Sequence, residues 1–394
     1  MKMWIYIVRR VLLLVPVIIG VMTITFAIVS QLGVGNRLVS TLGPNKFGYS
    51  PTIPCSRLVP NETGLCPNPA YYNGLHALGL DQPIWTQWAH YMYDSLTLQW
   101  GFTSAHGPTS LVFGEQQLPV ATVLSWYLPY TLELAAISLA LILLIAIPIG
   151  NYSAVYRNRP IDQGARILSF SGFALPSFIL ATLALVAATV IGGGFTPQCG
   201  NESFPYYQFV GSWPQPPCLP GGVYPSWLST NFQSSPTGFP TIDALIHGQY
   251  WLAGDTLFRM LIPAAVIAFG AVASILRFVR NSMLEVLNMD FVRTARSKGV
   301  SESRVVSRHA GRNSLNVTVT VLGLTFAGFI GGFPIIEEVF GLKGIGLMLA
   351  LSIQPPYDYG LIFGSTLLFT IIVVIANIIV DILYAYLDPR VRLG

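Results

Sequence analysis

Six stretches of the chain are apolar for long enough to cross a lipid bilayer, and polar residues gather between them. A membrane-spanning helix needs about 20 apolar residues, because each residue adds about 1.5 Å of rise. The six predicted spans cover residues 11–31, 130–151, 167–192, 261–280, 317–340 and 359–386. The pattern therefore predicts an all-α polytopic membrane protein with six transmembrane helices.

Composition agrees with a membrane location. Of the 394 residues, 53% are hydrophobic and only 10% are charged, whereas a soluble domain carries about 25% charged residues. Lys2, Arg9 and Arg10 precede the first span, as basic residues precede a cleaved signal peptide. The apolar core of this span is longer than the roughly 7–15 residues of a signal peptide, so we expect a retained transmembrane helix.

The basic residues predict the orientation of the chain. Sixteen of the 21 Lys and Arg residues fall in 1–10, 152–166, 277–316 and 387–394. Cytoplasmic loops carry such an excess, so both termini are expected in the cytoplasm of a multi-pass protein of the cell membrane. The net charge of +4 follows from this topology and indicates no nucleic-acid partner.

The predicted spans divide the chain into five segments. They are an N-terminal transmembrane helix (1–31), an extracellular loop (32–119), the second and third spans (120–192), a second extracellular loop (193–256), and the last three spans with a cytoplasmic loop at 285–316 (257–394).

The cysteines fall only in the two extracellular loops, as Cys55, Cys66, Cys199 and Cys218. Thiols on an oxidising face indicate disulfides, and their short separations favour one bond within each loop, although four cysteines allow three pairings. A zinc site would need closer cysteines with histidine partners, so no metal is expected. N-glycosylation sequons begin on the same face at Asn61 and Asn201.

The second extracellular loop has an unusual composition. Pro, Gly, Tyr, Trp and Ser dominate it, and residues 193–258 contain no Lys or Arg. Its proline content is also typical of a disordered linker. The cysteine pair and the many aromatic residues favour a small ordered cap.

The cytoplasmic loop has a helical pattern of its own. Residues 291–298 contain no Gly or Pro and can form two helical turns. Gly299 can take the left-handed conformation that ends a helix. Ser301 is a suitable N-cap for a second helix that reaches His309. A short rigid helix of this kind can dock on a partner and transmit its motion to the spans.

This loop resembles the ATPase-coupling loop (the EAA loop) of ABC importer permeases. The sequence R-T-A-R-S-K-G from Arg293 is most similar to the dipeptide/oligopeptide branch, as are G-F-A-L-P-S-F from Gly172 and D-P-R-V-R from Asp388. The resemblance implies a type I ABC importer permease fold and ATPase contacts by Arg293, Thr294, Ala295, Arg296, Lys298, Gly299, Arg304, Arg308 and His309. Alternatively, the basic residues only enforce topology or contact anionic lipid headgroups.

The resemblance also implies partners. The chain would form half of the translocation path for peptides or oligosaccharides, together with a second permease subunit in the bilayer. Two cytosolic ABC ATPases with ATP and Mg²⁺, and an extracellular, membrane-anchored solute-binding protein, would complete the importer. Pro176, between Phe173 and Phe178, is a candidate for lining the path. A proline kink in a membrane helix is also common for structural reasons alone.

Enzymatic chemistry is not expected on this chain. The sequence contains no G-x-x-x-x-G-K-[ST] phosphate-binding loop, and its Ser, His and acidic residues form no recognisable triad. No cofactor is therefore predicted on this chain. The alternative is a proton-coupled secondary transporter, for which the carboxylates of Glu133, Glu337, Glu338 and Asp381 would be candidates. No inverted repeat supports that alternative.

Overall fold

The computed structural model describes residues 3–33, 37–38, 51–55, 58, 64–104, 117–191, 237–248, 250–311, 313–314, 333–355 and 357–387. Its elements, in order, are α1 (Met3–Ser30), β1 (Thr52–Pro54), β2 (Leu65–Pro67), α3 (Pro69–Ala77), α4 (Ile84–Leu96), α6 (Val120–Val155), α7 (Pro160–Ala174), α8 (Ser177–Ile191), α11 (Pro240–Ile246), α12 (Tyr250–Leu287), α13 (Asp290–Ser297), α14 (Glu302–Arg304), the π-helix η3 (Val305–Ala310), α16 (Phe333–Phe340), α17 (Ile345–Ser352) and α18 (Tyr359–Leu387). The predicted mostly helical fold is confirmed.

Three helices in the described part of the chain are long and apolar enough to cross a membrane. They are α6, α12 from Thr256 onward, and α18 as far as Ile379. The apolar part of α1 is shorter, at Val15–Ser30. Residues 315–332 lie outside the described residues and include most of the predicted fifth span. A multi-pass protein is therefore supported, while the number six stays a prediction.

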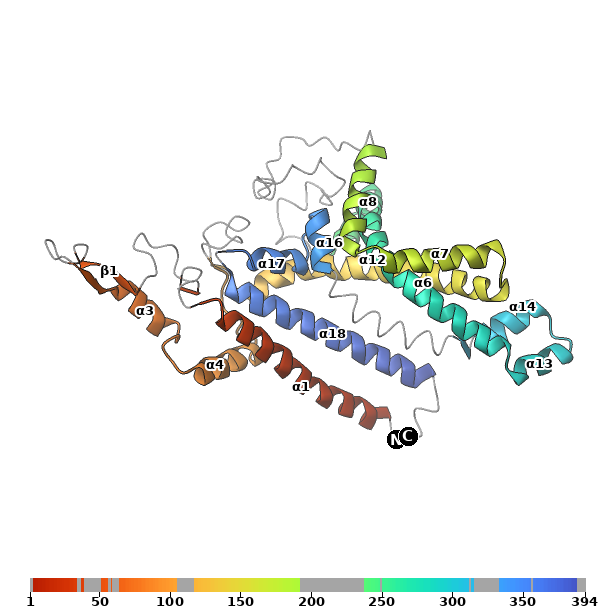
Figure 1. The fold of residues 1–394 in the computed structure, drawn as a ribbon, viewed down its shortest axis with the longest axis horizontal. Coiled ribbons are helices and arrows are strands. Elements are labelled where there is room, and N and C mark those ends of the chain that lie inside the picture. The colour runs from red at the N-terminus through yellow and green to blue at the C-terminus, as the bar shows by residue number, and fades with distance from the viewer. Residues whose placement is uncertain are drawn as a thin grey trace.

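The predicted third span is broken rather than continuous. Helices α7 and α8 meet at an angle of 108°, and Figure 1 shows α8 standing across the direction of α7. Leu175, between them, has an extended backbone with φ −102° and ψ 117°. Proline disfavours a helical conformation in the residue before it, so Pro176 accounts for the break. The kink considered at Pro176 is present, and it divides the predicted span over 167–192 into two helices.

Helix α12 packs along α6 and α7 to form the centre of the bundle. Two glycines allow these close approaches. A Cβ atom on Gly150 of α6 would lie 2.7 Å from Cβ of Val279, and one on Gly172 of α7 would overlap Cβ of Ala273. Small residues let helix backbones approach in this way in membrane proteins.

Helices α1 and α18 lie side by side, with the start of α1 next to the end of α18 (Figure 1). The start of α1 and the end of α18 therefore lie on the same side of the molecule, which is consistent with an even number of crossings. On the opposite side, β1 and β2 form an antiparallel pair with Ile53 opposite Cys66.

The disulfide Cys55–Cys66 closes this small hairpin, with a Cα–Cα distance of 4.9 Å. The predicted bond between Cys55 and Cys66 is present, while the extracellular location of this segment stays a prediction. Cys199, Cys218, Asn61 and Asn201 lie outside the described residues. The second disulfide, the sequons and the ordered cap over 193–256 therefore stay predictions.

Candidate functional site

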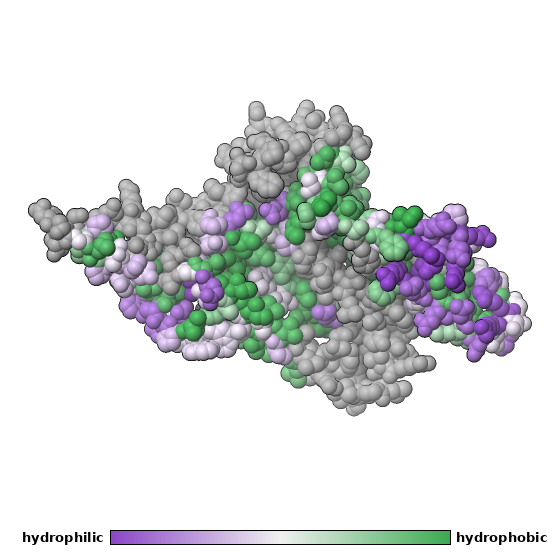
Figure 2. Space-filling view, viewed as in Figure 1, coloured by the Kyte–Doolittle hydropathy of each residue, from purple (hydrophilic) through white to green (hydrophobic). Residues whose placement is uncertain are grey.

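Helix α13 turns an apolar edge to the bundle and a basic edge outward. Val292 is fully buried and Ala295 is 8% exposed, three residues apart on one face. They pack with Met283 of α12 and Val305 of η3 in one apolar cluster. The loop is therefore fixed to the end of α12 that leads into it. Figure 2 shows hydrophilic residues gathered at the end of the molecule that carries α13 and α14.

Gly299 forms the turn after α13. Its φ is +76°, the left-handed conformation that the sequence predicted. The amide of Gly299 donates to the carbonyl of Arg296 at 2.9 Å, and the amide of Val300 donates to that of Ala295 at 3.3 Å. These bonds satisfy carbonyl groups that the end of a helix leaves unpaired. Nothing lies within 4 Å of a Cβ atom on Gly299, so the backbone conformation alone selects glycine.

The second predicted helix is present, but most of it is a π-helix. Ser301 occupies the N-cap position without a side-chain hydrogen bond, and α14 contains only three residues before η3 begins. The amide of Gly311 donates to the carbonyl of Val306, the five-residue spacing of a π-helix. A Cβ atom at Gly311 would lie 3.0 Å from this carbonyl oxygen, which favours glycine. The helix reaches His309, as predicted.

An ion pair ties the two helices of the loop together. Nη2 of Arg296 lies 2.6 Å from Oε1 of Glu302, and Nε lies 3.0 Å from Oε2. This bidentate bond lowers the pKa of Glu302 and raises the pKa of Arg296. Arg293 extends into solvent, with a looser 3.6 Å contact to Asp290. Arg293 is thus better placed than Arg296 to meet a partner.

A second carboxylate, not anticipated from the sequence, connects α7 to α12. Asp162 is fully buried and accepts hydrogen bonds from Nε of Arg280 at 2.6 Å and from Nη2 at 3.1 Å. Arg166 and the amide of Asn158 complete the cluster at 2.9 and 3.0 Å. Because α12 leads directly into the α13 loop, this cluster fixes the base on which the loop stands.

Two of the four carboxylates considered for proton coupling, Glu337 and Glu133, are engaged in structural hydrogen bonds. Glu337 of α16 is fully buried; it accepts from Oγ1 of Thr131 at 2.7 Å and from the amide of Leu347 at 3.1 Å. Glu133 accepts from the amide of Thr241 at 3.3 Å. These bonds attach α16, α17 and α11 to α6. The side chain of Asp381 lies outside the described residues.

The candidate path residues lie at the α7–α8 break, away from the coupling loop. Pro176 is exposed and the Phe178 side chain is 52% exposed in the single chain. The side chain of Phe173 lies outside the described part. Within the residues that the structure describes, no group of three or more His, Cys, Asp or Glu side chains could hold a metal ion.

Comparison with known proteins gives consistent matches over most of the chain. Residues 146–393 match the family model of the binding-protein-dependent transport system inner membrane component. The dipeptide transport system permease protein DppB of Escherichia coli K12 is 29% identical over 387 residues, which are 98% of each chain. The oligopeptide transport system permease protein AppB of Bacillus subtilis is 28% identical over 98% of this chain and 99% of its own. The probable D,D-dipeptide permease DdpB of E. coli K12 is 33% identical over 80% of this chain and 83% of its own.

Proposed function

This chain belongs to the family of binding-protein-dependent transport system inner membrane components, and on that premise we propose that it forms half of the translocation path of an ATP-driven peptide importer. It is a permease subunit of an ABC importer and not an enzyme. The relatives are named for dipeptides, oligopeptides and D,D-dipeptides, which favours peptides over oligosaccharides as the substrate.

The proposed complex contains three kinds of partner in or around the bilayer. A second permease completes the path, two cytosolic ATPases supply ATP hydrolysis with Mg²⁺, and a membrane-anchored solute-binding protein delivers substrate from outside. Both termini lie in the cytoplasm. The positive-inside distribution supports this orientation, because the basic loop around α13 then faces the ATPases.

The observation that carries the proposal is the construction of α13. Its apolar edge is anchored on α12 and η3, and its arginines point away from the bundle. Such a helix can fit a groove of a cytosolic partner, with arginines donating to carboxylates and carbonyl groups. Arg293, Thr294 and Lys298 are the proposed contact residues. Ala295, Gly299 and the η3 residues Arg308 and His309 shape the surface.

Replacement of Arg293 by Glu tests the contact. On dilution, the purified importer should lose its ATPase subunits at about tenfold higher protein concentrations than the wild type, because a charge-assisted contact becomes a repulsive one and weakens binding. Arg157→Glu is the matched control, since Arg157 is exposed near the same end of the bundle but outside the loop. Equal ATPase retention in the R293E and R157E complexes would contradict docking through α13.

Replacement of Gly299 by Val tests the coupling. A β-branched residue resists positive φ and should distort the turn, at a cost of about 1–2 kcal/mol. Transport into proteoliposomes should fall while the spans still insert. Gly164→Val is the control, because Gly164 of α7 has equally open surroundings and no positive φ. Undiminished transport in G299V would show that the turn does not transmit motion.

The proton-coupled alternative gains no support. Glu133 and Glu337 hold helices together through the hydrogen bonds described above. The relatives with long matches are named as transport system permeases.

A further inference from the structure

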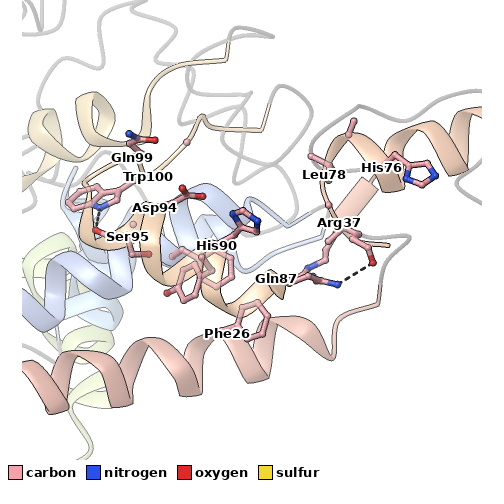
Figure 3. Close-up of a pocket in the computed structure, with 17 residues that line it drawn as sticks. Phe26, Arg37, His76, Leu78, Gln87, His90, Asp94, Ser95, Gln99 and Trp100 are labelled. Carbon is pink, nitrogen blue, oxygen red and sulfur yellow. Dashed lines mark hydrogen bonds between the residues drawn. The ribbon is translucent and has the colours of Figure 1, made fainter. Parts of the chain in front are cut away.

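A cavity of about 550 Å³ lies between α1, α4 and the first turns of α18 (Figure 3). Small-molecule sites typically have about 300–1,000 Å³. In the proposed orientation the cavity opens on the outer side, because it lies at the end of α1 that enters the first extracellular loop. The α13 coupling loop contributes no residue to it.

Helix α4 turns a polar stripe toward this cavity. The lining residues on α4 follow helical spacing, at Gln87, His90, Tyr91, Asp94 and Ser95. A neighbouring edge of the helix is fixed to the bundle, since Met92 packs with Met22 and Leu367, and Nε1 of Trp88 donates to Thr23 at 3.2 Å. Because packing orients the helix, the polar stripe is held in place.

At one end of the cavity, Arg37 is set in position by a relay of hydrogen bonds. Its Nη1 donates to Oε1 of Gln87 at 3.2 Å. The amide of Gln87 in turn donates to the carbonyl groups of Leu80 and Gln82 at 3.2 and 2.9 Å. This glutamine is therefore fixed from both sides, and it orients the guanidinium before any ligand arrives. Burial lowers the pKa of Arg37, but an arginine stays charged.

Aromatic rings form the adjoining wall. The guanidinium of Arg37 lies 5.9 Å from the ring centre of Phe26 and 5.8 Å from that of Tyr359. Tyr91 contacts Phe363 of α18 with ring centres 4.3 Å apart. A cation beside an apolar wall suits a ligand that carries a carboxylate next to a hydrocarbon group.

Asp94 supplies a negative group on the same lining. Its side chain is exposed, and Figure 3 shows it with His90 between Arg37 and Trp100. A ligand with one negative and one positive end would find a group of opposite charge for each end, in Arg37 and Asp94. The cavity thus combines an anion-binding group, a cation-binding group and an aromatic wall.

We propose that this cavity is a binding site for a short peptide with free amino and carboxyl termini, the carboxylate held by Arg37 and the ammonium group by Asp94. The inference rests on the proposed function, because a peptide importer exposes its outer side to such ligands. It adds a peptide site on the permease itself, separate from the coupling loop.

The test uses the purified importer in nanodiscs of phosphatidylglycerol, without binding protein, and the dipeptide alanyl-phenylalanine as probe. Calorimetric titration should show saturable binding. Acetylation of the amino terminus and amidation of the carboxyl terminus should each weaken binding about tenfold or more, because each removes a charge-assisted bond. Equal binding of the free and doubly blocked dipeptide would overturn the proposal.

Two variants separate recognition from a general structural effect. In Arg37→Gln, the free and amidated dipeptides should bind equally, while acetylation still weakens binding. In Asp94→Asn, the acetylated and free dipeptides should bind equally, while amidation still weakens binding. Because Asp94 is exposed, this variant is expected to fold. The remote change Arg157→Gln is a control and should preserve both discriminations. Failure of both variants to show this crossed pattern would overturn the assignment.

A phospholipid headgroup with an amine shares the zwitterionic chemistry. If phosphatidylethanolamine in the nanodisc abolishes dipeptide binding at the same protein concentration, a lipid occupies the cavity and the peptide assignment is wrong. ATPase retention is measured on the same preparations. Absent dipeptide binding with retained ATPases overturns this site alone, whereas absent ATPases contradict the proposed function.

Discussion

In the proposed orientation, the cytoplasmic (inner) and extracellular (outer) ends of the bundle use buried carboxylates in different ways. At the inner end, Asp162 accepts from the guanidinium groups of Arg280 and Arg166. At the outer end, Glu337 accepts from a hydroxyl group and a backbone amide. The difference follows the distribution of basic residues, because the inner loops contain most of them. Inner acids can therefore pair with a cation, whereas outer acids hold short helices by their backbones.

The comparison is tested most strongly at Asp162. Asp162→Asn removes the charge that balances Arg280, and breaking one side of a buried ion pair costs about 3–5 kcal/mol. Transport should be nearly abolished, and the complex should lose thermal stability. The exchanged pair Asp162→Arg with Arg280→Asp should recover part of the loss. Wild-type transport in D162N would show that the ion pair does not support the loop.

Removal of the Cys55–Cys66 disulfide is expected to have the next largest effect on stability, and this effect should be confined to the outer end. Cys55→Ser should destabilise the β1–β2 hairpin by about 3 kcal/mol or less, because the closed loop is short. Limited proteolysis should cut between residues 51 and 68 faster than in the wild type. ATPase retention should stay unchanged. A change in ATPase retention would show that the two ends are not independent.

Glu337→Gln is expected to lower the stability only slightly, in contrast to Asp162→Asn. The amide oxygen of glutamine can still accept one of the two hydrogen bonds, and an uncharged replacement leaves no cation unpaired. Thr131→Val should cost more, about 1–3 kcal/mol, because it removes one donor from the carboxylate of Glu337 and the acceptor of the Ile345 amide. Thermal unfolding of both variants shows which of them loses more stability. A larger loss in E337Q would contradict the role assigned to the outer acids.

The smallest expected effect concerns pH and the Arg296–Glu302 pair. The ion pair lowers the pKa of Glu302 in the folded loop. The stability that the pair adds to the loop is therefore complete above the ordinary glutamate pKa of about 4.3, and it is lost as the pH falls through the lowered pKa. Amide exchange around Gly299 should therefore be constant near neutral pH and faster in acid. Glu302→Gln should remove this pH dependence. The same dependence in E302Q would assign it to another group.

Two local features of the chain could be predicted from the sequence. Gly299 was recognisable because few residues adopt positive φ, and Cys55–Cys66 because the two residues lie close together on the extracellular side. The Asp162–Arg280 bond joins residues 118 positions apart, and no local pattern indicates it. The sequence showed a kink at Pro176, but its angle depends on how α8 packs against α16.

Helix α12 has 38 residues and runs from the segment after α11 to the start of the coupling loop. At about 1.5 Å per residue it is about 57 Å long. A tilt of 10° about one end would move the other end by about 10 Å at this length. The helix is thus long enough to act as a lever, in which a small rotation at the end that meets the α13 loop would become a displacement of about 10 Å at the other end.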